Sequence, residues 1–508
     1  MQEYYSYHIF YFPFKWEIPG EEKKLFSDQV DLEHISISNC SNWERVQLDK
    51  EPRVLSPSEI KEQEELFGER QYYYDFVHPV LYDMKGAEDS IIHHYERREP
   101  KERLVEYSIE LKHKTYVLRL DALNVNLYST GVGIMSFYLK NEREDQSDES
   151  SIRDINQFGR RIMPPHAGEF MKQNRGLVAQ SIRIEGLDGD TGLYMDSFDY
   201  IKDDGSAMQR GFSNVWEPSL FIKQLIFDLS SQLKVTPVID DRMLVNCWYC
   251  NNELSGQIKN DKSFVTEDLW YKYVFVDNGN DWDDVTCLND EMKKDLLKKS
   301  TYSRWQKKGT LYGISRYSMV ALMESNWFSI NILAMHMRTI YSRMFELVII
   351  QRASMLRFSS EVTKVSSLKG QKTKDIAERV NSLYKEYIRF INQIYFRNVT
   401  AQDQGIELYE MLLEQFNTEV LIKDLDEEIG ELHQYITLKI DQRRSENGDW
   451  LNKLAAIFLP ASLLTGVFGM NPIFGCDALS PEDWGVQLGV IIVSSIILMF
   501  FILRRKGE

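Results

Sequence analysis

The sequence predicts an α+β cytoplasmic domain followed by long stalk helices and two C-terminal transmembrane helices. Three observations support this fold class. The first 300 residues mix strand and helix signals, and apolar residues recur at helical spacing from about Arg304 onward. Two apolar stretches then follow, from Leu451 to Asn471 and from Val486 to Leu503. Each of them reaches about 30 Å as a helix, which is the thickness of the hydrocarbon core of a membrane.

The predicted domains follow these changes in pattern. Residues 1–300 form a cytoplasmic α+β sensor domain, 301–448 a long-helix stalk, 449–471 transmembrane helix 1, 472–484 a short external loop, 485–503 transmembrane helix 2, and 504–508 a basic cytoplasmic tail. The alternative for the two apolar stretches is a pair of buried core helices. Two stretches in tandem with charged ends favour the membrane.

Charge sets the expected partners and the orientation. A net charge of −17 argues against a nucleic-acid-binding surface. Basic residues flank the apolar stretches at Arg443, Arg444 and 504–506, whereas the loop between the stretches has no Lys or Arg. We therefore expect both termini on the cytoplasmic side of a bacterial inner membrane, with the lipid bilayer as a partner.

The cysteines point to neither disulfides nor a metal. Five cysteines form no disulfide framework, and only Cys247 and Cys250 are close in sequence. This pair supplies half of a zinc site at most, and no second ligand pair follows at a suitable spacing. A buried strand is the favoured interpretation, so we expect no protein-bound metal there.

Strand signals within the first 300 residues support the α+β prediction. Thr115–Leu127 and Ile134–Leu139 are rich in β-formers and flank Thr130–Gly133, which predicts a hairpin. A phosphate-binding glycine loop is the alternative for that turn, but it lacks a third glycine and a following helix. Further strands are expected at Gln180–Ile184, Lys234–Ile239, Leu244–Tyr249 and Tyr271–Val276.

The helical part contains two seams with alternating steps of three and four residues. One comprises Ile376, Val380, Leu383, Tyr387, Ile391 and Ile394, and the other Ile422, Leu425, Ile429, Leu432 and Ile436. The second seam continues from about Ile406 into the first apolar stretch with only Gly430 and Gly448 as weak interruptions. We therefore predict one helix of about 65 residues, close to 100 Å long.

Candidate pore-lining residues lie on the first apolar stretch. Small or weakly polar side chains share one helical face, and the stretch closes on a Gly-Met-Asn motif. The candidates are Ala455, Leu459, Ser462, Gly466, Gly469, Met470 and Asn471. Helix packing is the alternative for the face, and a helix C-cap before Pro472 is a compatible reading of Asn471.

Pro460, the run Gly466–Asn471, Trp484–Gly485 and the basic tail together resemble the CorA superfamily of divalent-cation channels. The resemblance implies a CorA-like homopentameric funnel with a soluble α/β domain, a long helix lining the pore, and the asparagine at the pore mouth. The loop after the motif, Pro472–Asp477, departs from the family's usual continuation. The resemblance therefore does not extend to magnesium selectivity.

Leu118–Asp121 and Thr130–Ile134, in the long N-terminal domain, resemble the CorA-like effectors associated with type III CRISPR systems. This resemblance implies gating by a nucleotide second messenger, S-adenosyl-methionine-AMP, with membrane disruption as the antiviral outcome. No covalently bound cofactor is expected.

A ligand of that kind needs arginine forks for phosphate, an aromatic face and a carboxylate. Arg160 and Arg161 lie in a Gly/Pro-framed loop, and Asp240, Asp241 and Arg242 follow a predicted strand. These five are the candidate ligand-binding residues. Surface ion pairs are the alternative for both motifs.

Catalysis has little support, because the sequence contains no Walker loop, no Gly-x-Ser-x-Gly and no His-Glu-x-x-His motif. We therefore expect no enzymatic activity, and the resemblance implies a messenger-gated channel. A constitutive divalent-cation channel regulated by intracellular Mg²⁺ is the alternative function. A membrane-tethered scaffold is a third hypothesis, from a different class.

Overall fold

The computed structural model describes most of the chain up to residue 469. The described residues are 4–19, 25–26, 30–38, 42–49, 66, 68–87, 89–99, 103–160, 179–187, 192–197, 218–240, 242–279, 285–366 and 373–469, with five positions beyond them, 485, 489, 492, 493 and 496. Two compact units are formed. The first comprises residues 1–367 and 381–429, and the second comprises 368–380 and 430–508.

A mixed β-sheet organises the first unit. The described strands form one 13-stranded sheet with the path β11-β12-β13-β10-β1-β6-β5-β4-β7-β8. Off this path, β3 pairs with β5 and with β2, and β9 pairs with β1. The strands are β1 (Ser6–Glu17), β2 (Trp43–Arg45), β3 (Ile92–Arg97), β4 (Glu106–Glu110), β5 (Thr115–Tyr128), β6 (Val132–Asn141), β7 (Ser181–Leu187), β8 (Gly192–Ser197), β9 (Lys234–Pro237), β10 (Leu244–Cys250), β11 (Thr301–Tyr302), β12 (Leu311–Ile314) and β13 (Ser318–Met323). The predicted domain boundary at residue 300 thus falls inside the sheet.

The helices and short turns follow this order. The helices are α3 (His78–Leu81), α4 (Glu149–Gly159), α7 (Leu220–Leu229), α8 (Asn252–Asn260), α9 (Asp268–Phe275), α10 (Asp290–Ser300), α11 (Ala334–Arg338), α12 (Ile340–Ser366), α13 (Thr373–Gln393), α14 (Asp403–Gln415) and α15 (Thr418–Gly469). Shorter pieces are η1 (Leu32–His34), η2 (Asp75–Val77), η3 (Glu144–Gln146), η6 (Lys262–Thr266), η7 (Gln306–Lys308) and the π-helical turn η8 (Ser329–Leu333).

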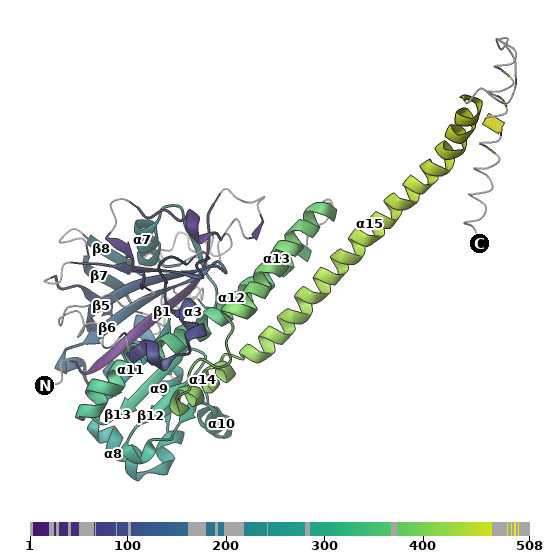
Figure 1. Ribbon diagram of the computed structural model, residues 1–508. Coiled ribbons are helices and arrows are strands. Elements are labelled where there is room, and N and C mark those ends of the chain that lie inside the picture. Colours follow the sequence, from purple (N-terminus) through teal and green to yellow (C-terminus); the bar gives the residue numbers. More distant parts are fainter. Residues whose placement is uncertain are drawn as a thin grey trace. The chain divides into compact units, whose positions relative to one another are not determined.

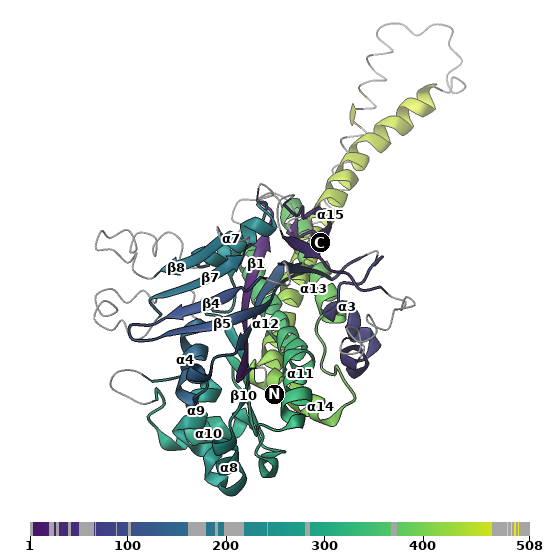
Figure 2. The ribbon, with the colours of Figure 1, turned by 90° about the vertical axis from the view of Figure 1, so that its left-hand side faces the viewer.

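Strand β1 lies at the centre of the sheet and is covered on both faces. Successive side chains of a strand point to opposite faces. His8 contacts Asn156 of α4, with 2.7 Å between Nδ1 and Oδ1, whereas the Tyr11 hydroxyl bonds to Ser342 of α12 at 2.6 Å. Helices α4 and α12 therefore cover opposite faces of β1, and Figure 2 shows them on either side of it. Figure 1 shows α12 next to β1.

The predicted hairpin between Thr115 and Leu139 is confirmed as β5 paired antiparallel with β6. Gly131 in its turn has φ +71°, and a Cβ there would lie 2.4 Å from a methyl group of Val30. Glycine meets both requirements of the turn, the backbone conformation and the close approach. The strands expected near Gln180, Lys234 and Leu244 are also confirmed, as β7, β9 and β10.

The strand predicted at Tyr271–Val276 is wrong, because this segment belongs to helix α9. Aromatic and β-branched residues suggested a strand. Trp270, Tyr273 and Val274 are instead buried at helical spacing of three and four residues, so packing of one helical face decides the structure. The helix ends at Val276, whose φ is 51°.

The prediction of a single helix of about 65 residues is also wrong for the first part of that segment. Asn417, with φ 54°, separates α14 from α15. From Thr418 to Gly469 the helix is continuous through Gly430 and Gly448. At about 1.5 Å per residue its 52 residues extend to roughly 78 Å.

The prediction of two C-terminal transmembrane helices, and with it the fold class as stated, is contradicted. Within the residues that the structure describes, no helix is long and apolar enough to cross a membrane. In the part of α15 that follows Leu451, polar groups of Asn452, Lys453, Ser462 and Thr465 interrupt the apolar sequence. The α+β N-terminal domain and the long C-terminal helices agree with the prediction.

Candidate functional site: an arginine cluster around Tyr317

The two predicted ligand motifs lie in the first unit and are both partly described. Arg160 is the C-terminal cap of α4 and is 3% exposed. Asp240 and Arg242 are half-buried in the connection between β9 and β10. Arg161 and Asp241 lie outside the described residues.

The structure brings these two motifs together on one aromatic ring. The guanidinium carbon of Arg160 lies 5.5 Å from the centroid of the Tyr317 ring, and that of Arg242 lies 5.1 Å from the same centroid. Tyr317 belongs to the tight turn between β12 and β13, where its backbone N–H donates to the Ser315 hydroxyl at 3.2 Å. Stacking on one ring fixes the planes of two cationic groups relative to each other.

Hydrogen bonds hold each arginine in place. Arg242 donates from Nε and Nη2 to Oδ2 of Asp240, at 3.1 and 2.7 Å. Arg160 donates from Nη2 to the Val276 carbonyl at 3.1 Å, and its own carbonyl accepts from the Met243 N–H at 2.7 Å. The last bond ties the end of α4 directly to the start of β10, so the two motifs share a backbone contact as well as a ring.

Two further arginines complete the group. Arg316 precedes Tyr317 in the turn and is exposed. Arg352, on α12, is half-buried; burial lowers the pKa of its guanidinium, and the nearby charge of Arg316 lowers that pKa further. We call Arg160, Asp240, Arg242, Arg316, Tyr317 and Arg352 the Tyr317 cluster.

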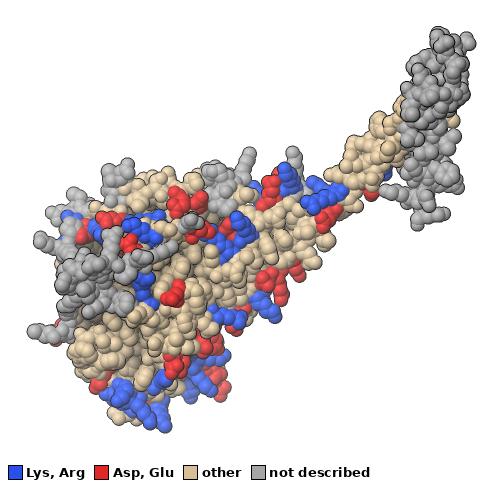
Figure 3. All heavy atoms as spheres, in the orientation of Figure 1, with Lys and Arg blue, Asp and Glu red and all other residues tan. Residues whose placement is uncertain are grey.

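The chemistry of the Tyr317 cluster suits a phosphate-bearing aromatic ligand. Guanidinium groups donate paired hydrogen bonds to phosphate oxygens, and an aromatic or guanidinium plane can stack on a base. Asp240 adds a carboxylate that can accept from an ammonium or from sugar hydroxyls. On the face of the molecule that Figure 3 draws in colour, charges of both signs are interspersed.

Sequence reasoning missed Tyr317, Arg316 and Arg352. The signal for the first two was the dipeptide Arg-Tyr in a short polar turn between two buried strands. Arg352 lies on α12, and the sequence contains no local sign of its electrostatic interaction with Arg316.

The candidate pore-lining residues lie on or just beyond α15, in the second unit. Ala455, Leu459, Ser462 and Gly466 are exposed on α15, and the Ser462 hydroxyl donates to the Leu459 carbonyl at 3.0 Å. Gly469 is the last residue of the helix. Met470 and Asn471 lie outside the described residues. The lining role therefore stays a prediction.

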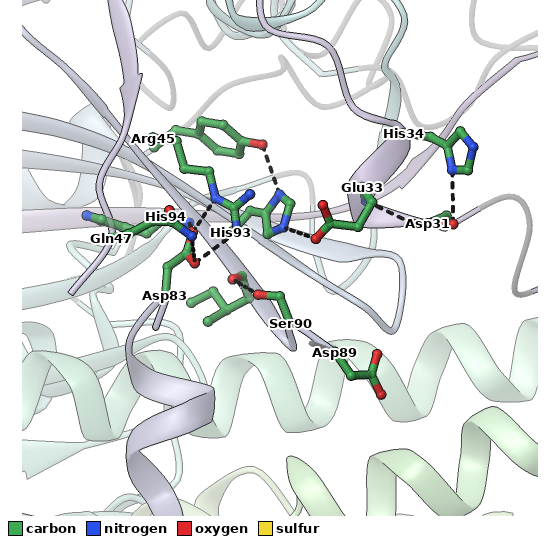
Figure 4. A network of polar contacts seen from close by, with 12 residues as sticks. Asp31, Glu33, His34, Arg45, Gln47, Asp83, Asp89, Ser90, His93 and His94 are labelled. Atoms are coloured by element: carbon green, nitrogen blue, oxygen red, sulfur yellow. Dashed lines mark hydrogen bonds and ion pairs between the residues drawn. The ribbon is translucent and has the colours of Figure 1, made fainter. Parts of the chain in front are cut away.

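A second polar group, unforeseen from the sequence, lies around Asp83 and the paired histidines of β3 (Figure 4). The buried Asp83 carboxylate accepts from Arg45 Nε and Nη2 at 2.6 and 2.9 Å and from Gln47 Nε2 at 3.0 Å. The backbone N–H of His94 also donates to it at 3.2 Å. These bonds link β2 and β3 to the segment after α3, so we interpret the group as one that stabilises the fold.

The histidine part of this network continues into α12. His94 Nδ1 lies 2.5 Å from Asn126 Oδ1, and the Asn126 amide donates to the buried carboxylate of Glu346. His94 Nε2 lies 3.0 Å from Glu96, and this hydrogen bond lowers the pKa of the Glu96 carboxyl. No His, Cys, Asp and Glu side chains in the described part of the chain form a group of three or more that could hold a metal ion.

An acidic hollow of about 190 Å³ lies beside this network. Its charged lining comprises Asp31, Glu33, Asp89, Glu386 and Arg389. Figure 4 shows Asp31, Glu33 and Asp89 along one side of the network. Arg389 pairs with Asp89, and burial raises the pKa of Glu386. The hollow thus contains its own counter-ion, and its geometry does not define a cation site.

Comparison with known proteins supports the CorA resemblance over the helical part of the chain. Residues 331–505 match the family of CorA-like Mg2+ transporter proteins. The match begins within η8 and includes α11 to α15. Members of the CorA family are typically homo-oligomeric. Among curated proteins, none matches this sequence significantly.

Proposed function

We propose that this chain is a CorA-like protein of the divalent-cation-transporter type that acts as a type III CRISPR antiviral effector. In this proposal a nucleotide second messenger, S-adenosyl-methionine-AMP, binds to a homopentamer at the bacterial inner membrane. Binding opens an ion path, and the resulting permeability halts the infected cell. The chain binds and conducts; no catalytic step is assigned to it.

The observation that carries the proposal is the meeting of Arg160 and Arg242 on the ring of Tyr317, at 5.5 and 5.1 Å. The two arginines come from motifs that are distant in sequence, and each is held by its own hydrogen bonds. An adenylated methionine derivative presents a phosphate for the guanidinium groups, a purine for stacking, and an ammonium for Asp240.

Gating requires that the messenger bind the open form more tightly than the closed form. A shift from 1:99 to 99:1 needs a difference of about 5.5 kcal/mol, or about 10⁴-fold in affinity. Charge-assisted hydrogen bonds contribute about 1.5–3 kcal/mol each. About two to four such bonds, formed only in the open state, are therefore sufficient, and the Tyr317 cluster offers four guanidinium groups.

Binding to the purified full-length protein tests the proposal. Calorimetry with S-adenosyl-methionine-AMP is compared with cyclic oligoadenylates, ATP and S-adenosyl-methionine. We expect selective binding of the first ligand and an affinity about tenfold lower in Arg242→Gln, equivalent to 1.4 kcal/mol. Arg304→Gln is the matched control, because Arg304 is an exposed arginine whose ion pair is with Glu407. Equal affinity for all ligands, or equal effects of the two substitutions, contradicts the proposal.

The match of residues 331–505 to CorA-like Mg2+ transporters also favours a second candidate, a constitutive Mg²⁺ channel regulated by intracellular Mg²⁺. Ion flux into vesicles containing the protein separates the two. Flux that begins on removal of Mg²⁺ without any nucleotide supports the second candidate, whereas flux that needs the messenger supports the first.

A further inference from the structure

Arg352 belongs to the Tyr317 cluster and also contacts the junction of α14 with α15, through the Phe416 carbonyl. We infer that Arg352 is a positioning residue that couples an anion bound at the Tyr317 cluster to this junction. The inference rests on the proposed function, because it assumes that a phosphate-bearing ligand occupies the cluster. Beyond that function, it identifies the contacts of Arg352 as the means by which the ligand acts on the long helix α15.

The junction is a sharp break in an otherwise helical segment. The N–H of Phe416 bonds to the Leu412 carbonyl at 3.0 Å and completes α14, after which Asn417 adopts the left-handed conformation with φ 54°. The chain then re-enters a helix, and the Leu421 N–H reaches the Asn417 carbonyl at 3.2 Å. The left-handed conformation is unfavourable for residues with a Cβ, so this break persists only with support from its surroundings.

Arg352 supplies part of that support. Its Nη1 donates to the Phe416 carbonyl at 2.6 Å, and its guanidinium carbon lies 5.8 Å from the centroid of the Phe416 ring. The final carbonyls of a helix lack partners within the helix, and a cationic side chain is a favourable partner for them. The Phe416 carbonyl is such a group, since α14 does not continue beyond it.

The same guanidinium lies within electrostatic range of Arg316, whose positive charge lowers the pKa of Arg352 and so opposes its protonated form. The Nε of Arg352 is buried and has no hydrogen-bond partner among the described residues. A buried donor without an acceptor, beside a second cation, is the arrangement that an anion relieves.

A phosphate at the cluster therefore competes with the Phe416 carbonyl for Arg352. It accepts from Nε, offsets the repulsion between Arg352 and Arg316, and draws the guanidinium from the end of α14. The Phe416 carbonyl then loses its cationic partner, and the left-handed Asn417 loses part of its support. The segment from Phe416 to Leu421 becomes free to rearrange, and α15 begins within that segment.

Amide hydrogen exchange in the full-length protein measures this directly. S-adenosyl-methionine-AMP is the probe, with ATP in parallel, and the readout is the exchange rate of the amides from Phe416 to Leu421. We expect the probe to raise this rate several-fold in the wild type. In Arg352→Gln the rate should be raised without the probe and should change less than twofold on its addition, with the probe at a concentration that calorimetry shows to saturate each protein.

Arg304→Gln is the control and should respond like the wild type. Asn417→Gly is a second variant for the case in which Arg352→Gln does not fold. Glycine accepts the left-handed conformation, so it should preserve the break, retain binding, and reduce the rise in exchange.

The outcomes are distinct. No binding of the probe to the wild type overturns the proposed function, and the coupling fails with it. The coupling alone is overturned if every variant binds the probe and Arg352→Gln shows the same rise in exchange as the wild type. Where Arg352→Gln does not fold, the same result in Asn417→Gly overturns it.

Discussion

Replacing Tyr317 tests whether the ring, and not merely the arginines, builds the candidate site. The ring contacts two guanidinium groups, one of which belongs to the fully enclosed Arg160. A cation–π contact contributes about 0.5–1 kcal/mol at exposed sites and about 2 kcal/mol when desolvated. We therefore expect Tyr317→Ala to lose about 2 kcal/mol of interaction that orients the two arginines.

The assay is calorimetric binding of S-adenosyl-methionine-AMP to the full-length protein. A loss of about 2 kcal/mol corresponds to roughly 30-fold weaker binding at 1.4 kcal/mol per tenfold. Tyr317→Phe retains the ring and should bind within about threefold of the wild type. Equal affinity of the wild type and Tyr317→Ala for the ligand refutes a role of the ring in binding. An equal loss of affinity in Tyr317→Ala and Tyr317→Phe shows that the hydroxyl, and not the ring, is responsible.

Three further predictions concern the fold that holds this site. Glu346→Gln should lower the free energy of unfolding in urea by about 2 kcal/mol, since the buried carboxylate pairs with Arg343 and accepts from Asn126; an unchanged midpoint contradicts this. Burial lowers the pKa of His8 from 6.5 to about 4, so the unfolded state binds the extra proton between these values. Stability should therefore be fully present above pH 6.5 and fall by up to roughly 3 kcal/mol toward pH 4, and His8→Gln should flatten that dependence in pH-dependent unfolding. Gly133→Ala should destabilise by about 1–3 kcal/mol, because its Cβ would lie 2.6 Å from the Phe14 ring. Gly256→Ala on α8, which meets nothing within 4 Å, should stabilise by about 0.5–1 kcal/mol; thermal unfolding of the two variants compares them.

Local patterns in the sequence were sufficient where a segment makes its own contacts. The β5–β6 hairpin has β-rich flanks and a glycine at the position that needs positive φ, so pattern and structure agree. The same reasoning failed at Tyr271–Val276, where strand-forming residues fold as α9 because one helical face is buried. Intrinsic preference is weaker than burial of several aromatic side chains.

The break at Asn417 has a signal in the sequence. Asparagine tolerates the left-handed conformation better than most residues, and Thr418 follows it at the start of α15. Gly430 and Gly448, the weak interruptions expected from the sequence, lie within the continuous helix. A glycine in a helix has a cost of about 1 kcal/mol relative to alanine, which the rest of a long helix easily offsets.

The candidate site was predictable in part. Arg160, Asp240 and Arg242 follow from ligand chemistry and from their flanking elements, and all three lie in the Tyr317 cluster. Their convergence was not predictable, because it depends on β10 pairing parallel with β13, which places the turn before β13 beside the loop before β10. Such pairing of strands distant in sequence leaves no mark in either local pattern.

The buried polar side chains of α12 limit where a displacement of Arg352 can act. Arg357 donates to the carbonyls of Trp16 and Gly131, and Gln351 donates to the Ile394 carbonyl at 3.2 Å. Buried polar links contribute little net stability compared with apolar packing, but removing one partner is costly. They therefore hold α12 in one register against β1 and the hairpin turn. With the helix axis fixed in this way, a ligand that attracts Arg352 moves the side chain and not the helix. The Phe416 carbonyl at the end of α14 then loses its hydrogen bond from Arg352. This loss affects the first turn of α15.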